Sequence, residues 1–167
     1  KLFKTEVKGK VQTSLLESLG PSLDDLLFSC GGRFTLKTTL LLFDQMLSLV
    51  KTLHQKGYVH GNIKPNHFLL GNGDRRDVVY LIDFANARNM ASSKDQNTFC
   101  HLDFDFASAS TLANKQPTWR DDIESLTYVM IYFLCGKFPW TEKLFDIQSK
   151  EESENTKGDI NSLKQAY

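Results

Sequence analysis

The stretch that decides the fold runs from residue 58 to residue 70 and reads Tyr58-Val59-His60-Gly61-Asn62-Ile63-Lys64-Pro65-Asn66-His67-Phe68-Leu69-Leu70. It ends in an apolar run, Phe68 to Leu70, and a second apolar run, Val78 to Ile82, follows the polar residues 71–74. Two short apolar runs separated by such residues are typical of a β hairpin. We therefore predict a small β ribbon directly after a polar loop.

Upstream of this loop the sequence predicts a long helix. Six residues recur at spacings of three and four and form one stripe, which ends near Gly57: Leu36, Leu40, Phe43, Leu47, Val50 and His54. Because His54 continues an apolar stripe, we interpret it as a packing residue. Further upstream, residues 11–17 favour a strand, and Ser22 with Asp25 forms a capping pair that opens a short helix.

Downstream of the ribbon the pattern changes twice. Residues 86–117 show no hydrophobic period and are rich in Ser, Asn, Thr and Lys, which predicts a long ordered loop of the kind usually kept for function. Residues 122–135 are apolar on nearly every face and stop before Gly136, which predicts a helix buried on all sides. The polar stretch 148–159 predicts a mobile loop before a last short helix at 160–167.

The composition indicates one soluble domain. The chain has 167 residues, and its 20 Lys and Arg balance its 20 Asp and Glu, so no global charge attracts nucleic acid or anionic lipid. The cysteines Cys30, Cys100 and Cys135 are odd in number and lack C-x-x-C spacing, which argues against a disulfide framework or a zinc site. No apolar run is long enough to span a membrane, and no secretory signal is present. We expect an intracellular protein, cytoplasmic or cytoskeletal, with protein partners, no nucleic acid and no membrane.

Four sequence blocks stand in a fixed order along the chain. They are LGPSLDDL at 19–26, YVHGNIKPNHFLL at 58–70, YLIDFANA at 80–87 and RDDIESLTYVMIYFLCGKFPW at 120–140. Together they resemble the casein kinase 1 family of protein kinases, with tau-tubulin kinases and vaccinia-related kinases as near relatives, over roughly residues 12–140. The resemblance implies an α+β, protein-kinase-like fold over residues 1–167, mainly the α-helical C-terminal lobe with a short β ribbon.

The resemblance also implies the roles of particular regions. These are a hinge at about 16–21, a catalytic-loop region at 60–70, a DFG-like segment at 83–85, an activation-loop region at 86–117 and a central helix at 122–135. It implies that the hinge holds the adenine of ATP, with Leu16 at the gatekeeper position and Leu19 and Leu69 as further nucleotide contacts. The structural positions that it implies are Asp122, which supports the catalytic loop, and His60, which stacks beneath Phe84.

The catalytic loop departs from the family pattern H-R-D-I-K-P-D-N at three chemically important positions. Asn62 replaces the general base with an amide, and a positioned base typically contributes about 10²–10⁴ in rate, or roughly 3–5 kcal/mol. His67 replaces an Asn that binds metal, although Mg²⁺ prefers hard oxygen donors. Gly61 replaces the arginine that pairs with a phosphorylated activation loop in many kinases.

Two further positions differ from the family pattern, and two others keep the family residue. Ala85 replaces the glycine of the DFG motif and restricts the local backbone, and Asp105 replaces an arginine of an anion pocket, so it should repel phosphate. Asp83 and Lys64 remain, which would allow weak binding of ATP and Mg²⁺ through one metal and one phosphate contact. For Asp83 the alternative is a carboxylate that only caps nearby backbone. For His67 the alternative is a core histidine without a ligand role.

Two functions follow as hypotheses. The first is a catalytically impaired casein kinase 1-like pseudokinase, which acts as a scaffold or structural subunit in an intracellular assembly and is not an enzyme. The second is a divergent ATP-dependent Ser/Thr protein kinase with weak phosphoryl transfer. The chain also begins after the positions where a kinase carries its Gly-rich loop and its ATP-anchoring strand lysine. The two alternatives are a protein without the N-terminal lobe and a sequence that starts partway through its domain.

Overall fold

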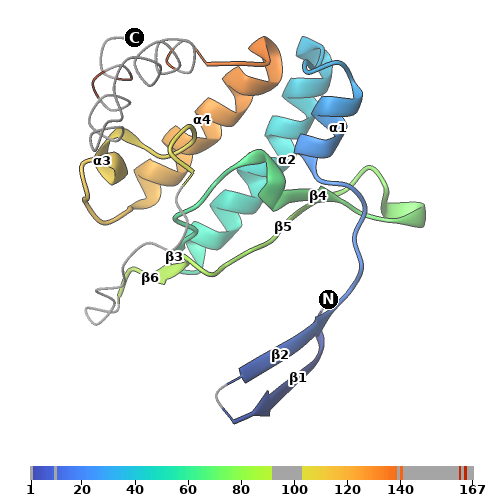
Figure 1. The fold of residues 1–167 in the computed structure, drawn as a ribbon, viewed down its shortest axis with the longest axis vertical. Coiled ribbons are helices and arrows are strands. Elements are labelled where there is room, and N and C mark those ends of the chain that lie inside the picture. Colours follow the sequence, from blue (N-terminus) through green and yellow to red (C-terminus); the bar gives the residue numbers. More distant parts are fainter. Residues whose placement is uncertain are drawn as a thin grey trace, which may run out of the picture.

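The computed structural model describes residues 2–9, 11–91, 103–138, 140, 162 and 164. In this part of the chain two long helices form the centre, and shorter helices and two-stranded sheets lie around them (Figure 1). The elements are β1 (Leu2–Lys8), β2 (Val11–Leu16), α1 (Leu23–Ser29), α2 (Leu36–Gln55), β3 (Tyr58–Val59), η1 (Pro65–His67), β4 (Phe68–Leu70), η2 (Gly73–Arg75), β5 (Val79–Leu81), β6 (Arg88–Asn89), α3 (Ala109–Leu112) and α4 (Trp119–Cys135), where η marks a 3-10 helix. No helix among the described residues is long and apolar enough to cross a membrane.

Helices α2 and α4 pack together around the core. Helix α2 begins after Thr35, whose hydroxyl accepts a hydrogen bond from the backbone N–H of Thr38 at 3.2 Å. Both predicted long helices are confirmed. Burying a large apolar side chain stabilises the fold by roughly 1.5–3 kcal/mol. The apolar side chains with no exposed surface are Leu23, Met46, Val50, Val59, Phe68, Leu126, Val129 and Phe133.

The predicted buried stripe of α2 is partly wrong. Leu36, Leu40 and Leu47 are exposed, whereas the core-facing residues of the helix include Met46 and Val50. The run of leucines at 40–42 puts apolar side chains on more than one face, so spacing alone did not identify the face that packs on α4.

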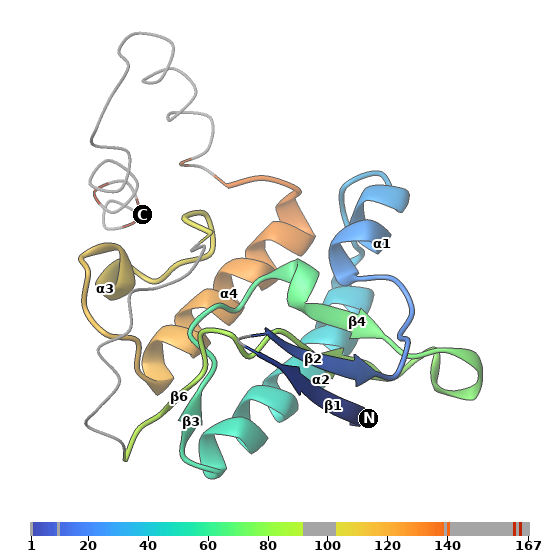
Figure 2. The same ribbon diagram turned by 60° about the horizontal axis from the view of Figure 1, so that its bottom comes forward.

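The short helix α1 forms where the capping pair was predicted. The hydroxyl of Ser22 accepts a hydrogen bond from the backbone N–H of Asp25 at 3.1 Å, and Oδ2 of Asp25 accepts one from the N–H of Ser22 at 3.1 Å. Such a box satisfies two N–H groups at the start of a helix. Figures 1 and 2 place α1 and α3 on opposite sides of the α2–α4 pair.

The predicted ribbon is the antiparallel pair β4–β5, in which Leu69 lies opposite Tyr80. Its connection spans residues 71–78 and contains η2, so it is longer than the predicted turn. The predicted strand at 11–17 is β2, which pairs with β1 in a hairpin that extends away from the helices (Figure 1). Strand β1 was not predicted, because Lys4, Thr5 and Glu6 separate its apolar residues.

Two predictions about the second half of the chain need correction. Helix α4 starts at Trp119, and Ile123, Thr127 and Cys135 are exposed, so the helix is not buried on all sides. Residues 86–117 are not one loop, since they contain β6 and α3. Cys100, the predicted mobile loop at 148–159 and the predicted last helix, apart from two of its residues, lie outside the described residues.

Candidate functional site

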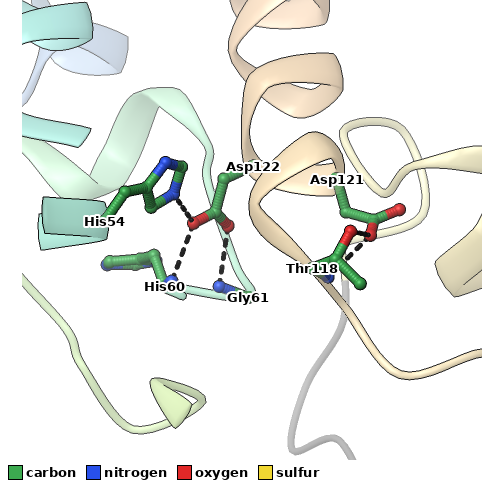
Figure 3. Close-up of polar contacts among 6 residues, drawn as sticks. All are labelled: His54, His60, Gly61, Thr118, Asp121 and Asp122. Carbon is green, nitrogen blue, oxygen red and sulfur yellow. Dashed lines mark hydrogen bonds and ion pairs between the residues drawn. The ribbon is translucent and has the colours of Figure 1, made fainter. Parts of the chain in front are cut away.

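One buried carboxylate, that of Asp122 in α4, holds the start of the polar loop 60–67 (Figure 3). Asp122 is 2 % exposed, and its Oδ2 accepts a hydrogen bond from the backbone N–H of His60 at 2.8 Å. Its Oδ1 accepts one from the N–H of Gly61 at 2.9 Å. Backbone N–H groups outside regular structure need such partners when they are buried. The carboxylate therefore fixes the position of the loop relative to α4.

His54 also contacts this carboxylate, so its interpretation as a packing residue was incomplete. Its Nε2 lies 2.8 Å from Oδ2 of Asp122, and its side chain is 14 % exposed. The ring also lies near Trp119, with 6.3 Å between the ring centroids. Spacing along a helix shows which face a residue occupies, but a buried polar ring also needs a hydrogen-bond partner.

The neighbouring acid, Asp121, has a different set of partners (Figure 3). It accepts hydrogen bonds from the backbone N–H of Thr118 at 2.6 Å and from the hydroxyls of Thr118 at 2.7 Å, Ser108 at 2.6 Å and Ser110. Burial raises the pKa of Asp121, but the hydrogen bonds outweigh this effect, so its pKa lies below the ordinary value. Asp121 thus joins the segment around α3 to the start of α4.

His60 lies against Phe84, although the rings are tilted and not stacked as predicted. Their centroids are 5.2 Å apart and the interplanar angle is 60°. Burial lowers the pKa of His60, and its Nε2 lies 3.1 Å from the backbone carbonyl oxygen of Ile82. A neutral ring near pH 7 can donate this hydrogen bond through Nε2–H.

His67 and Asp83 bring together the two positions at which the resemblance implied metal binding. His67 is 7 % exposed, and its Nε2 lies 3.1 Å from Oδ2 of Asp83. Its Nδ1 lies 2.9 Å from the backbone carbonyl oxygen of Asn62. The other oxygen of Asp83, Oδ1, accepts a hydrogen bond from the N–H of Ala85 at 3.3 Å. The Asp83 carboxylate therefore caps nearby backbone and also contacts an imidazole.

Both ring nitrogens of His67 face oxygen atoms. A carbonyl oxygen and an ionised carboxylate can only accept hydrogen bonds. Burial lowers the pKa of His67, while the Asn62 carbonyl and the Asp83 carboxylate oppose this effect. A neutral ring carries one N–H and can donate to only one of the two oxygens at a time, whereas the cationic ring satisfies both.

The side chains at this point do not fit a Mg²⁺ site. An imidazole nitrogen stands where the resemblance implies an oxygen ligand, and Mg²⁺ strongly prefers oxygen. Across the residues that the structure describes, no group of three or more His, Cys, Asp or Glu side chains could hold a metal ion. His67 and Asp83 therefore offer one imidazole and one carboxylate in place of two oxygen ligands.

Lys64 faces an acidic residue from another part of the chain. Its Nζ lies 3.8 Å from Oδ2 of Asp103, with the two side chains 20 % and 35 % exposed. Asp103 also lines an open groove of about 410 Å³ together with Asp24, Asn66 and Asp105. Burial raises the pKa of Asp24, and the nearby carboxylates of Asp25 and Asp103 add to that effect. Acidic groups thus form much of the groove wall.

A second, more apolar pocket lies between the linker that follows β2 and the ribbon β4–β5. Its volume is about 560 Å³, which is within the usual range for small-molecule sites. It brings together the three leucines implied as nucleotide contacts. The residues that line it are Leu16, Glu17, Leu19, Leu69, Tyr80, Leu81, Ile82, Asp83 and Phe84.

Gly61 adopts a backbone conformation that favours glycine. Its φ is +74°, in the left-handed region. A Cβ atom added here would lie 2.9 Å from the carbonyl oxygen of Asn86, so the segment after the DFG-like residues approaches this glycine closely. The local backbone explains why position 61 carries no side chain.

Sequence reasoning missed the role of Lys164. Its ammonium group donates hydrogen bonds to the backbone carbonyl oxygens of Phe104 at 3.0 Å, Asp105 at 2.9 Å and Ala107 at 2.7 Å. It also lies over the aromatic rings of Tyr128 at 4.4 Å and Trp140 at 5.0 Å. Nothing in the local sequence distinguishes this lysine from a solvated one, because its partners are about 60 residues away along the chain.

A comparison with protein-family models shows the family of the chain. The model described as the protein kinase domain matches residues 12–165 of the 167 residues. The match covers β2 from its second residue and all the elements from α1 to α4, including the loop 60–67, Asp83 and Asp122.

Proposed function

The chain belongs to the protein kinase family, and from this premise we propose that it is a catalytically impaired member of the casein kinase 1 type. In this proposal it corresponds mainly to the C-terminal lobe and serves as a scaffold or structural subunit in an intracellular assembly. Its binding partners would be proteins, and any binding of ATP with Mg²⁺ would be weak.

The observation that carries this proposal is the contact between His67 and Asp83. The imidazole Nε2 lies 3.1 Å from the carboxylate at the point where phosphoryl transfer needs oxygen ligands around Mg²⁺. The amide of Asn62 adds to the loss, since it cannot accept a proton from a substrate hydroxyl near neutral pH. By contrast, the Asp122 network that positions the loop is complete. The loop is therefore held in position while the groups that phosphoryl transfer needs have changed, which is what we expect of a scaffold.

The competing function is a divergent Ser/Thr kinase with weak ATP-dependent transfer. The apolar pocket beside Asp83 favours it, because the pocket could accept an adenine ring, and so does Lys64, which could contact a phosphate. The two functions differ in whether ATP with Mg²⁺ binds and whether phosphate is transferred.

A thermal-shift titration of the full chain with ATP and Mg²⁺ tests the first difference. We expect the unfolding midpoint to rise by less than about 1 °C, because a ligand stabilises the folded state only when its concentration approaches its dissociation constant. His67→Asn restores an oxygen ligand and should give a larger, Mg²⁺-dependent rise of about 2–4 °C. ATP with EDTA is the matched control. A clear Mg²⁺-dependent rise in the unmodified chain would contradict the proposal.

A radiolabel transfer assay tests the second difference. Asn62→Asp alone is expected to give no measurable transfer, because it restores the base position while His67 still faces Asp83. The double variant Asn62→Asp/His67→Asn separates loss of the base from loss of the metal ligand. Transfer by the unmodified full-length protein that disappears in Asp83→Ala would overturn the scaffold proposal and support the weak kinase.

A further inference from the structure

The pair Lys64–Asp103 joins the loop 60–67 to the segment that precedes α3. Lys64 comes immediately before η1, where Pro65 starts the 3-10 turn. Its Nζ reaches to 3.8 Å from Oδ2 of Asp103, and both side chains are partly shielded from water. A charge pair in this environment is screened less than one on the open surface.

The Asp103 carboxylate is held in place by its own turn. Its Oδ1 accepts a hydrogen bond from the N–H of Asp105 at 3.3 Å. Its backbone carbonyl oxygen accepts hydrogen bonds from the N–H groups of Phe106 at 3.2 Å and Ala107 at 3.0 Å. With Oδ1 and the main chain fixed in this way, Oδ2 is the oxygen that faces Lys64.

Asn62 and Asp103 face the same small space. Both line a cavity of about 10 Å³, together with Gly61, Ile63 and Phe106. A space of this size holds about one water molecule. Asn62 and Asp103 therefore line one space, and Asp103 also contacts Lys64.

We infer that Asp103 supplies, from a different segment of the chain, the carboxylate that position 62 lacks. In this arrangement Asp103, which lines the groove, is a positioning residue that holds the ammonium group of Lys64. The inference goes beyond the proposed function, because the pairing does not depend on nucleotide or on transfer. It also explains why an amide is suitable at position 62, since acids at both positions would place two like charges around one small cavity.

The inference also assigns a role to the segment around Asp103. Position 61 is a glycine, so the loop has no arginine there that could bind a phosphorylated segment. A contact between the loop and the segment around Asp103 therefore needs other side chains. The Lys64–Asp103 pair provides it from unmodified side chains, and it connects the loop to the acidic groove. The shape of the groove is therefore set without phosphorylation.

A charge-relocation cycle on the full chain tests the inference. The variants are Asn62→Asp, Asp103→Asn and the double variant, which moves the carboxylate from position 103 back to position 62. Asn62→Asp alone is expected to lower the unfolding midpoint by about 2–4 °C. The double variant is expected to unfold within about 1 °C of the unmodified chain. Asp74→Asn, at an exposed position in η2, is the matched control and should not interact with Asn62→Asp.

Amine labelling followed by mass spectrometry measures the reactivity of Lys64 directly. General destabilisation of the fold would not change the labelling rate of this lysine selectively. Asp103→Asn is expected to raise the labelling rate of Lys64 about threefold or more relative to Lys51, an exposed lysine on α2. Asp103→Glu and the double variant should return it to the original rate. If Lys64 labels equally in all folded variants, or if Asn62→Asp shifts the midpoint equally in both backgrounds, the inference is overturned.

Discussion

Replacing Asp122 by alanine is expected to lower the free energy of unfolding by about 3–5 kcal/mol, the usual cost of removing one partner of a buried charged contact. The substitution leaves the N–H groups of His60 and Gly61 without their acceptor, and it leaves His54 without its carboxylate. Equilibrium urea unfolding monitored by circular dichroism measures the change. Each buried donor left unpaired costs about 1–3 kcal/mol, so the loss should approach the upper end of the range.

Two variants control this experiment. Asp122→Asn keeps one oxygen acceptor but presents an NH₂ group to a neighbouring donor, so it should fall between the unmodified chain and the alanine variant. Asp44→Ala removes an exposed acid from α2 and should change the free energy of unfolding by less than about 0.5 kcal/mol. If Asp122→Ala behaves like Asp44→Ala, the carboxylate does not hold the loop.

Replacing Lys164 by methionine is expected to lower the free energy of unfolding by about 1–3 kcal/mol at pH 7. Methionine fills a similar volume, but it cannot donate to the three backbone carbonyls at 104, 105 and 107. Limited proteolysis measures the local effect, and cleavage within residues 103–108 should become faster. Lys37→Met, at an exposed position on α2, is the matched control and should change neither measurement.

The same lysine should give the protein an unusual dependence on pH. Burial lowers the pKa of Lys164 from the model-compound value of 10.5 to about 8. Below pH 8 the amine is protonated in both the folded and the unfolded chain, so it does not make the free energy of unfolding depend on pH. Between pH 8 and about 10.5 the unfolded chain binds the extra proton, so the contribution of Lys164 to stability rises with pH by up to roughly 3 kcal/mol.

The difference between the unfolding curves of the unmodified chain and Lys164→Met isolates this effect from other groups that titrate in the same range. The stability advantage of the unmodified chain should widen from pH 8 to pH 10. A difference that stays constant over this interval would show that the pKa of Lys164 is not lowered.

Local signals in the sequence predicted the elements whose causes are local. The capping pair at Ser22 predicted the start of α1, and apolar residues at helical spacing predicted α2. An apolar run that stops before Gly136 predicted α4. Strand β1 was missed because polar residues separate its apolar ones. The two-residue strands β3 and β6 were missed for another reason, because pairing with a distant segment stabilises strands this short. The buried face of α2 was assigned incorrectly for a related reason, since only the packed neighbours decide which of two apolar faces is covered.

For the site, the four blocks drew attention to individual residues such as Asp122, His67 and Asp83, but the contacts that these residues make could be seen only in the structure. Nothing in the sequence showed that His67 contacts Asp83, or that Asp103 lies beside Lys64, because each pair joins separate segments. His54 did carry a signal, since a histidine within an apolar stripe must find a polar partner. Lys164 carried none.

The backbone at Gly61 limits how this protein could change over evolutionary time. An arginine at this position would have to adopt a φ of +74° and place its Cβ 2.9 Å from the Asn86 carbonyl oxygen. Substituting arginine at position 61 alone would therefore strain the backbone, because the segment at Asn86 would first have to move. Position 61 and the segment at Asn86 are therefore coupled, and a side chain at the first requires a shift of the second.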